Sequence, residues 1–210
     1  MNKRSKLTGI LLTAILLFTG IFCLNVAAAD NTKQVDIMFV HDTHSHLNEF
    51  TTVENGQSQT MGGFAKIKTL INQQKEKNPD TLLLDAGDFS MGTLIQVIYA
   101  EEAPELRMLG DLGMDAVSFG NHEFDYKAAG LANMLNAAVA SGDPLPPIVL
   151  CNADWEGMKA KGLTEEQELL LQAFENYGVA EYIMVEKNGI NIAITGVIGI
   201  DSEACVPNCP

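Results

Sequence analysis

Three short apolar runs, each followed at once by a polar segment, constrain this chain more than any other feature. The polar segments are His41-Asp42-Thr43-His44, Gly87-Asp88 and Gly120-Asn121-His122-Glu123. Short apolar runs bounded by turn residues predict buried strands, so each segment is expected on a loop at the end of a sheet. Together these loops offer Asp, His, Asp and Asn, which are ligands that divalent metal ions accept.

The N-terminal segment has to be set apart before the fold is considered. Basic residues at positions 3, 4 and 6 precede a nearly continuous apolar stretch over 7–24, and three alanines follow at 27–29. This order predicts a secretory signal peptide over residues 1–29 and hence an exported protein, whether secreted, periplasmic or at the cell surface. An uncleaved membrane anchor is the alternative, because the apolar stretch approaches the length of a membrane span.

The charge of the remaining chain excludes one class of partner. Without the first 29 residues, ten basic residues stand against 27 acidic ones, which gives a net charge of −17. A protein that binds a nucleic-acid backbone needs a basic face, and none is present. A small phosphate ester is still a suitable substrate, since bound metal ions can supply positive charge locally.

Apolar periodicity predicts strands that alternate with helices. Strands are expected at 35–40, 81–84, 116–119 and 148–150, and helices at 64–77, 94–112 with a break near Pro104, 127–139 and 163–174. The polar stretch 48–60 is expected to be a loop. Two further strands, 182–185 and 190–197, flank Asn188-Gly189, a strong hairpin signal. This order predicts a single α/β domain with an antiparallel pair toward its end.

Spacing within the first two polar segments favours metal binding. Asp42 and His44 are two residues apart, so in extended geometry both side chains share a face and can chelate one ion. Gly87 permits a tight turn that presents Asp88. One carboxylate that bridges two cations is a common device of two-metal hydrolytic sites.

The third segment adds a neutral ligand and a histidine for chemistry. Asn121 supplies an amide oxygen, while its neighbour His122 is free to face a substrate. Asp125 follows three residues later and could hold the imidazole of His122 in its protonated form.

The order of these motifs resembles the calcineurin-like metallophosphoesterase superfamily. The longer sequence motifs are similar to those of the secreted 5′-nucleotidase and 2′,3′-cyclic-nucleotide phosphodiesterase family. They lie in segments 42–47, 62–65, 85–88, 114–117 and 120–126. The similarity runs over roughly residues 35 to 200. It implies a layered α/β/α metallophosphoesterase-type sheet with helices on its faces, and a nucleotide or another phosphate ester as substrate.

The resemblance also assigns roles, residue by residue. Asp42 and His44 would bind a first metal, Asp88 would bridge both ions, and Asn121 would bind the second. His122, with Asp125 as its partner, would stabilise the transferring phosphoryl group or protonate the leaving oxygen. The cofactors implied are two divalent ions, with Mn, Zn, Co, Mg or Fe all suitable, and a metal-bridging hydroxide as nucleophile.

The chain departs from the family pattern in its second half. The family carries a further His ligand, a later Gly-His-x-His pair and a separate nucleoside-binding domain, whereas the four histidines here all lie at or before His122. Residues 30–210 are therefore expected to be the N-terminal part of a metallophosphoesterase domain, incomplete at its C-terminal side. We expect poor metal binding and slow or no turnover from this chain alone.

Two alternative functions follow from the same residues. An exported inactive fragment or binding protein would explain the missing ligands. An amidohydrolase-type metal hydrolase often ends its first strand in Asp-x-His-x-His, as Asp42 to His46 does, but leaves Asn121 and His122 unexplained. His46 is accordingly expected to support the site and not to bind a metal ion directly. Glu123 is expected to be a helix cap or an ion-pair partner.

The cysteines allow one covalent link. Cys205 and Cys209 are close enough in sequence to pair across a tight loop in an exported protein. Cys151 follows the apolar run 148–150 and is expected to be a buried core thiol.

Overall fold

The computed structural model describes residues 32–205, without the side chains of 203 and 204. The predicted signal peptide over 1–29 lies outside these residues. The chain divides into two units, 1–34 and 35–210, and the second unit contains all the elements described below. Within the described part, no helix has the length and apolar character needed to cross a membrane.

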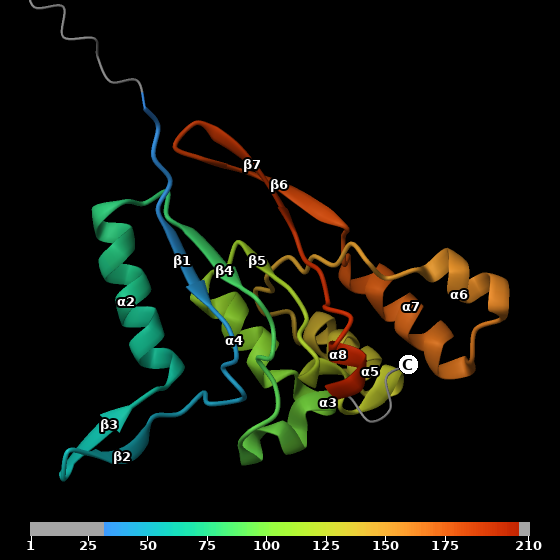
Figure 1. The fold of residues 1–210 in the computed structure, drawn as a ribbon, viewed down its shortest axis with the longest axis horizontal. Coiled ribbons are helices and arrows are strands. Elements are labelled where there is room, and N and C mark those ends of the chain that lie inside the picture. The colour runs from blue at the N-terminus through green and yellow to red at the C-terminus, as the bar shows by residue number, and fades with distance from the viewer. Residues whose placement is uncertain (1–31, 206–210) are drawn as a thin grey trace, which may run out of the picture. The chain divides into compact units, whose positions relative to one another are not determined.

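A parallel three-stranded sheet stands at the centre of the fold (Figure 1). Its strands are β1 (Ile37–Val40), β4 (Leu82–Asp85) and β5 (Ala116–Val117), in the order β1-β4-β5. Val40 pairs with Asp85, and Asp85 pairs with Val117, so the three strands end at the same level. Because parallel strands share a carboxyl edge, the polar segments that follow them lie along one edge, as the sequence predicts.

The helices pack together over one side of this sheet. They include α2 (Phe64–Lys77), α4 (Pro104–Leu112), α5 (Lys127–Ser141) and α7 (Glu165–Tyr177). Between α2 and α5, the short turns η1 (Leu94–Ile98) and α3 (Tyr99–Glu102) precede α4, and Ala103 breaks the run with a positive φ of 46°. The predicted break near Pro104 is therefore confirmed, and the α/β class with a helix layer is confirmed as well.

Two hairpins project from the domain, and only one was expected. β6 (Tyr182–Lys187) and β7 (Ile190–Thr195) pair antiparallel around Asn188-Gly189, as predicted. The expected loop over 48–60 is wrong, because β2 (Phe50–Glu54) and β3 (Gln57–Met61) form a second hairpin there. Its turn, Asn55-Gly56, has positive φ at both residues, which is the geometry that an Asn-Gly pair favours.

The segment after α5 differs from prediction in four ways. Residues 148–150 form isolated parallel bridges to Val117 and Ala180 instead of a continuous strand. Two helices were not expected, α6 (Trp155–Lys161) and the short α8 (Ser202–Cys205). Cys151 is exposed and not a core thiol, and its N–H donates to the carbonyl of Gly196 at 2.9 Å. Cys205 is exposed, and its predicted partner Cys209 lies outside the described residues.

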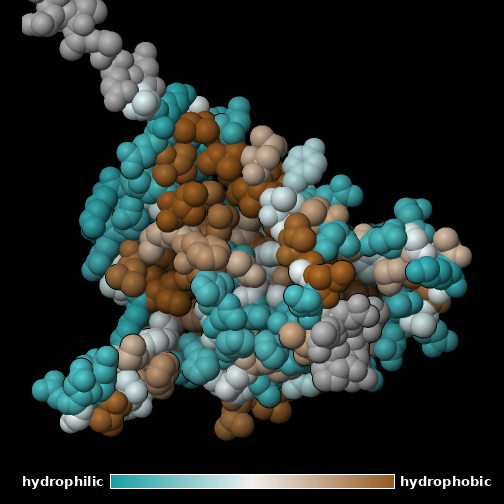
Figure 2. All heavy atoms as spheres, viewed as in Figure 1, coloured by the Kyte–Doolittle hydropathy of each residue, from teal (hydrophilic) through white to brown (hydrophobic). Residues whose placement is uncertain are grey.

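The side of the sheet opposite the helices presents apolar residues to solvent. Alternate residues of β1, Met38 and Val40, pack against the core, whereas Ile37 and Phe39 are 58% and 57% exposed. In Figure 2 hydrophobic spheres gather over β1, β4 and β5 on this side. We call it the outer face of the sheet.

Candidate metal centre

Backbone hydrogen bonds continue the pairing of β1 and β4 into the loops that follow them. The N–H of Asp42 donates to the carbonyl of Gly87 and that of His44 donates to the carbonyl of Asp88, both at 3.0 Å. Both loops contain left-handed, non-glycine residues, with φ of 50° at Asp42, 44° at His44 and 51° at Asp88. Such conformations are disfavoured and cluster at functional sites, where the surroundings hold them in place.

Glycines allow the loops to touch. A Cβ on Gly87 would lie 2.2 Å from the backbone nitrogen of Gly120, and one on Gly120 would lie 2.2 Å from Oδ1 of Asp88. A Cβ on Gly92 would similarly lie 2.6 Å from the carbonyl oxygen of His44. Any larger residue at Gly87 or Gly120 would push the second and third polar segments apart.

The side chains of Asp42, His44 and Asp88 converge. One ligand atom from each lies within 4.8 Å of the other two. His44 donates its Nδ1 proton to the carbonyl of Met91 at 3.0 Å, so its Nε2 lone pair faces Oδ1 of Asp42 at 3.5 Å. Two carboxylates and a correctly oriented imidazole are a suitable set for a divalent cation, because a backbone acceptor on Nδ1 is the usual way to fix a metal-binding histidine. The residues present therefore fit the metal that the sequence implies.

Asn121 is next in sequence to two residues that contact this group. Its neighbours on both sides touch Asp88: Gly120 by close packing, and His122 through an N–H that donates to Oδ1 at 2.9 Å. The backbone carbonyl of Asn121 accepts from Phe124 in the short turn η2 (His122–Phe124). The position of the side chain as a second-metal ligand stays a prediction.

His122 and Asp125 are paired as expected. Nδ1 of His122 lies 2.9 Å from Oδ2 of Asp125, and the two imidazole rings of His44 and His122 meet edge to face at 5.0 Å. Partial burial acts to lower the pKa of His122, but the hydrogen bond and charge of Asp125 and the charges of Asp88 and Glu123 outweigh it. The net pKa is raised, which favours the protonated imidazole.

Glu123 is the main residue whose role the sequence did not reveal. Its fully buried carboxylate accepts four hydrogen bonds, which come from the N–H groups of Asp88, Gly120 and Ser90 and from the hydroxyl of Ser90. Burial raises the pKa of Glu123, and the bonds from Ser90 and Gly120 oppose that rise. The expectation of a cap or ion-pair partner covers only the bond to Gly120, because the other three donors come from the loop after β4.

A second buried carboxyl, Glu105 on α4, supports the loop after β1. It accepts a hydrogen bond of 2.5 Å from the hydroxyl of Ser45, next to His44, and burial raises its pKa. A charged residue between apolar neighbours in a helix is the sequence signal that could have drawn attention to it.

The other two histidines do not join the ligand group. His41 is exposed and its Nδ1 lies 2.5 Å from Oδ2 of Asp42; this hydrogen bond is the main cause of the lowered pKa of Asp42. His46 is exposed and contacts the carbonyl of Thr43 at 3.2 Å. The amidohydrolase interpretation requires His46 as a second ligand, so this arrangement argues against it.

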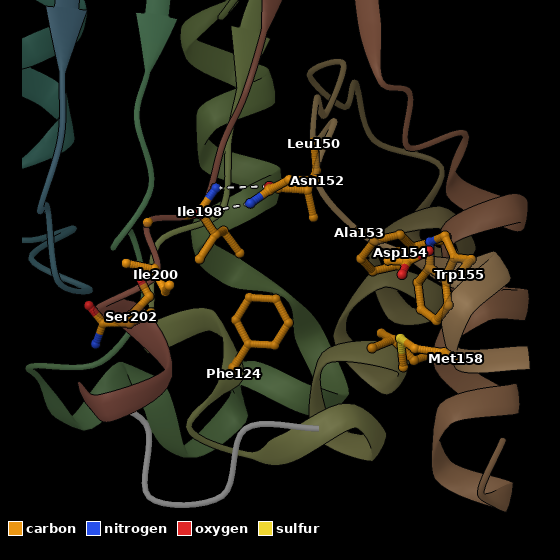
Figure 3. Close-up of a pocket in the computed structure, with 14 residues that line it drawn as sticks. Phe124, Leu150, Asn152, Ala153, Asp154, Trp155, Met158, Ile198, Ile200 and Ser202 are labelled. Atoms are coloured by element: carbon orange, nitrogen blue, oxygen red, sulfur yellow. Dashed lines mark hydrogen bonds between the residues drawn. The ribbon is translucent and has the colours of Figure 1, made fainter. Parts of the chain in front are cut away.

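A mainly apolar cavity of about 290 Å³ begins at Asn121. Phe124, Trp155 and Met158 lie around it, and Ile198 and Ile200 close it on the opposite side (Figure 3). The amide of Asn152 exchanges two hydrogen bonds with the backbone of Ile198, which link the two sides of the cavity. The cavity thus includes Asn121 of the third polar segment and offers aromatic surfaces.

Comparisons with known proteins agree with this geometry. A family model described as calcineurin-like phosphoesterase matches residues 35–193. The chain is 31% identical to the 5′-nucleotidase of Bos taurus over 160 residues, which are 73% of this chain and 27% of that protein. It is 28% identical to the trifunctional nucleotide phosphoesterase protein YfkN of Bacillus subtilis over 184 residues, 82% of this chain and 12% of that protein.

Solved structures give the same result for the fold. The 5′-nucleotidase precursor of Thermus thermophilus is similar with a TM-score of 0.60 and 27% identity, over 80% of this chain and 29% of that one. The NAD nucleotidase of Haemophilus influenzae, at 23% identity, has a TM-score of 0.60 over 83% of this chain and 28% of that one. The chain therefore spans less than a third of the length of these relatives.

Proposed function

Because this chain belongs to the calcineurin-like phosphoesterase family, we propose that it is a metal-dependent hydrolase of nucleotide phosphate esters, of the 5′-nucleotidase type. The convergence of Asp42, His44 and Asp88 at the carboxyl edge of the sheet carries the proposal. These are the residues expected to hold the first metal ion, and Asp88 lies nearest the third polar segment, where Asn121 would serve a second ion.

Divalent cations in such a site neutralise charge on a phosphoryl group and lower the pKa of water. The protein's own part is to hold the ligands and to manage a proton. His122, with Nδ1 fixed by Asp125 at 2.9 Å, presents its Nε2 proton to the phosphoryl oxygens or to the leaving oxygen. Asp125 keeps the imidazole charged, so removing Asp125 should impair the same step as removing His122.

The organic part of the substrate has a place in this proposal. The phosphoryl group would lie by Asn121 and His122, and the cavity that begins at Asn121 would receive the nucleoside. Trp155 is the only tryptophan of the chain, so its fluorescence reports the occupancy of this cavity. Addition of adenosine should quench it, and addition of ribose should not; equal responses to both would exclude this placement.

An exported binding protein without catalysis is the second candidate, because residues 123–210 contain no histidine that could complete a two-metal ligand set. Either way, the basic and apolar N-terminal sequence supports export. We expect slow turnover, because the four proposed ligands are fewer than two ions require.

Release of inorganic phosphate from AMP, with Mn²⁺ or Co²⁺ in excess, tests the enzyme proposal. The expected result is slow, metal-dependent hydrolysis that falls at least about 100-fold in Asp88→Asn and in His122→Ala. Hydrolysis that persists in both variants would contradict the assignment of the site. No hydrolysis, together with saturable binding of AMP, would favour the binding protein.

A further inference from the structure

The buried carboxylate of Glu123 joins two of the three polar segments. Its Oε2 accepts the N–H of Gly120 at 2.7 Å and that of Asp88 at 3.0 Å. Its Oε1 accepts the N–H of Ser90 at 3.0 Å and the Ser90 hydroxyl at 2.8 Å. A carboxylate with all its donors in place is a rigid junction, because a buried charge pays heavily for any donor it loses.

This junction holds Asp88 from two sides. The backbone N–H of Asp88 binds Glu123, while the carboxylate of Asp88 accepts the N–H of His122 at 2.9 Å. Asp88 has a left-handed backbone with φ of 51°, which a non-glycine residue adopts only when it is held from outside. His122 and Glu123, consecutive in sequence, supply that hold.

The same carboxylate reaches His44 through Ser90. Ser90 is fully buried, and the next residue, Met91, has a left-handed φ of 62°. The carbonyl of Met91 accepts Nδ1–H of His44 at 3.0 Å, the contact that points Nε2 of His44 toward Asp42. The position of the Ser90 backbone therefore sets the orientation of His44 as well as that of Asp88.

We propose that Glu123 is a positioning residue for the metal centre: it binds no metal, but its hydrogen bonds to Asp88, Gly120 and Ser90 set the geometry of the two ligands Asp88 and His44. The inference depends on the metal site of the proposed function. It goes beyond that function because it assigns metal affinity to a side chain that no ligand pattern includes.

Glu123→Gln is the decisive variant. Glutamine has the same shape, but its amide NH₂ would face either the N–H groups of Gly120 and Asp88 or the N–H of Ser90, so at least one of the backbone hydrogen bonds is lost. The Kd for Mn²⁺, measured on the full chain from the electron paramagnetic resonance signal of free Mn²⁺, should rise by about 10- to 100-fold, as for other groups that orient metal ligands. Circular dichroism on the same samples shows whether the fold is retained.

The matched control is Leu135→Ala. Leu135 is fully buried on α5 and belongs to none of the polar segments, so its truncation weakens the fold by opening a cavity in the core. A merely structural role for Glu123 predicts that both variants lose stability and that neither changes the Kd. The proposal predicts a raised Kd for Glu123→Gln alone.

Three further outcomes are distinct. An unchanged Kd in a folded Glu123→Gln protein would overturn the inference. If Glu123→Gln does not fold, Ser90→Ala removes one of the four hydrogen bonds and must still raise the Kd; an unchanged value would again overturn it. If the unmodified chain shows no saturable Mn²⁺ binding, the proposed function fails first, and the inference fails with it.

Discussion

Two buried carboxylates, one in the turn η2 and one at the end of β4, differ in the number of hydrogen bonds that they accept. Glu123, at the loop edge, accepts four hydrogen bonds from three residues. Asp85, at the end of β4, accepts one from the N–H of Gly87 at 2.8 Å, and its Oδ2 has no partner among the described residues. Asp85 lines a cavity of about 240 Å³ between the sheet and β7 together with Ser118, whose hydroxyl likewise has no partner among the described residues.

This difference separates the two regions by function. At the loop edge, satisfied polar groups and close glycine contacts fix the ligands in place. Around Asp85 an unsatisfied carboxylate, and on the outer face exposed apolar residues, leave the structure tolerant of change; burial raises the pKa of Asp85 to about 7. The effects of substitutions on the free energy of unfolding should therefore differ in size and in sign between the two regions.

Gly120→Ala should give the largest effect, because a Cβ there would lie 2.2 Å from Oδ1 of Asp88. We expect the free energy of unfolding to fall by about 3 kcal/mol, at the upper end of typical overpacking costs. Gly142→Ala, at the end of α5, is the matched control: it has a positive φ of 72° but open space around it, and should cost only about 1 kcal/mol. Urea denaturation measures both. Equal losses would mean that the loop edge is no more tightly packed than the surface.

Asp85→Asn should change the free energy of unfolding in the opposite direction. Its folded pKa of about 7 exceeds the ordinary value of 3.8, so the native state binds the proton more tightly than the unfolded state. The stability that the protonated carboxyl contributes is full below about pH 4 and is lost as pH rises toward and past 7. Asparagine carries no charge, so at pH 8 the variant should be more stable by roughly 1 to 3 kcal/mol, after allowance for its unpartnered amide.

The control for this prediction is the same pair of proteins at pH 4, with a chelator present throughout. The advantage of Asp85→Asn should disappear there, since wild-type Asp85 is then largely protonated in the native state. An advantage independent of pH would show that the cavity, and not the ionisation of Asp85, limits stability.

The convergence of Asp42, His44 and Asp88 could be predicted from sequence because each follows an apolar strand, and parallel strands end at one edge. The junction at Glu123 could not, because three of its four donors are backbone N–H groups that no side-chain pattern records. The same limit explains the missed β2–β3 hairpin.

In that hairpin nearly every residue is exposed, so no apolar alternation marks the strands, and only Asn55-Gly56 signals the turn. The prediction of a buried Cys151 was wrong for a related reason: an apolar run predicts burial of its own residues but not of the residue after it. The periodicity of apolar residues predicts the elements that pack against the core, but it does not predict those stabilised by backbone pairing alone.

Ile37→Thr on the outer face should give the smallest effect. Ile37 is 58% exposed and threonine keeps the β-branch, so stability should change by no more than about 0.5 kcal/mol. Val40→Thr, on the core side of the same strand, should cost about 1 kcal/mol or more because it buries a hydroxyl. Thermal unfolding followed by circular dichroism compares the two; an equal cost would mean that the outer face is as closely packed as the core side.

The central claim is that Asp42, His44, Asp88 and Asn121 surround divalent cations. Crystals of the full chain soaked in MnCl₂, with anomalous diffraction recorded near the manganese edge, test it most directly. The account predicts an anomalous peak within coordination distance of Nε2 of His44 and the carboxylates of Asp42 and Asp88, with a second peak, if present, beside Asn121. Well-ordered loops with no peak between these side chains, and Asp42 still bound to His41, would contradict it.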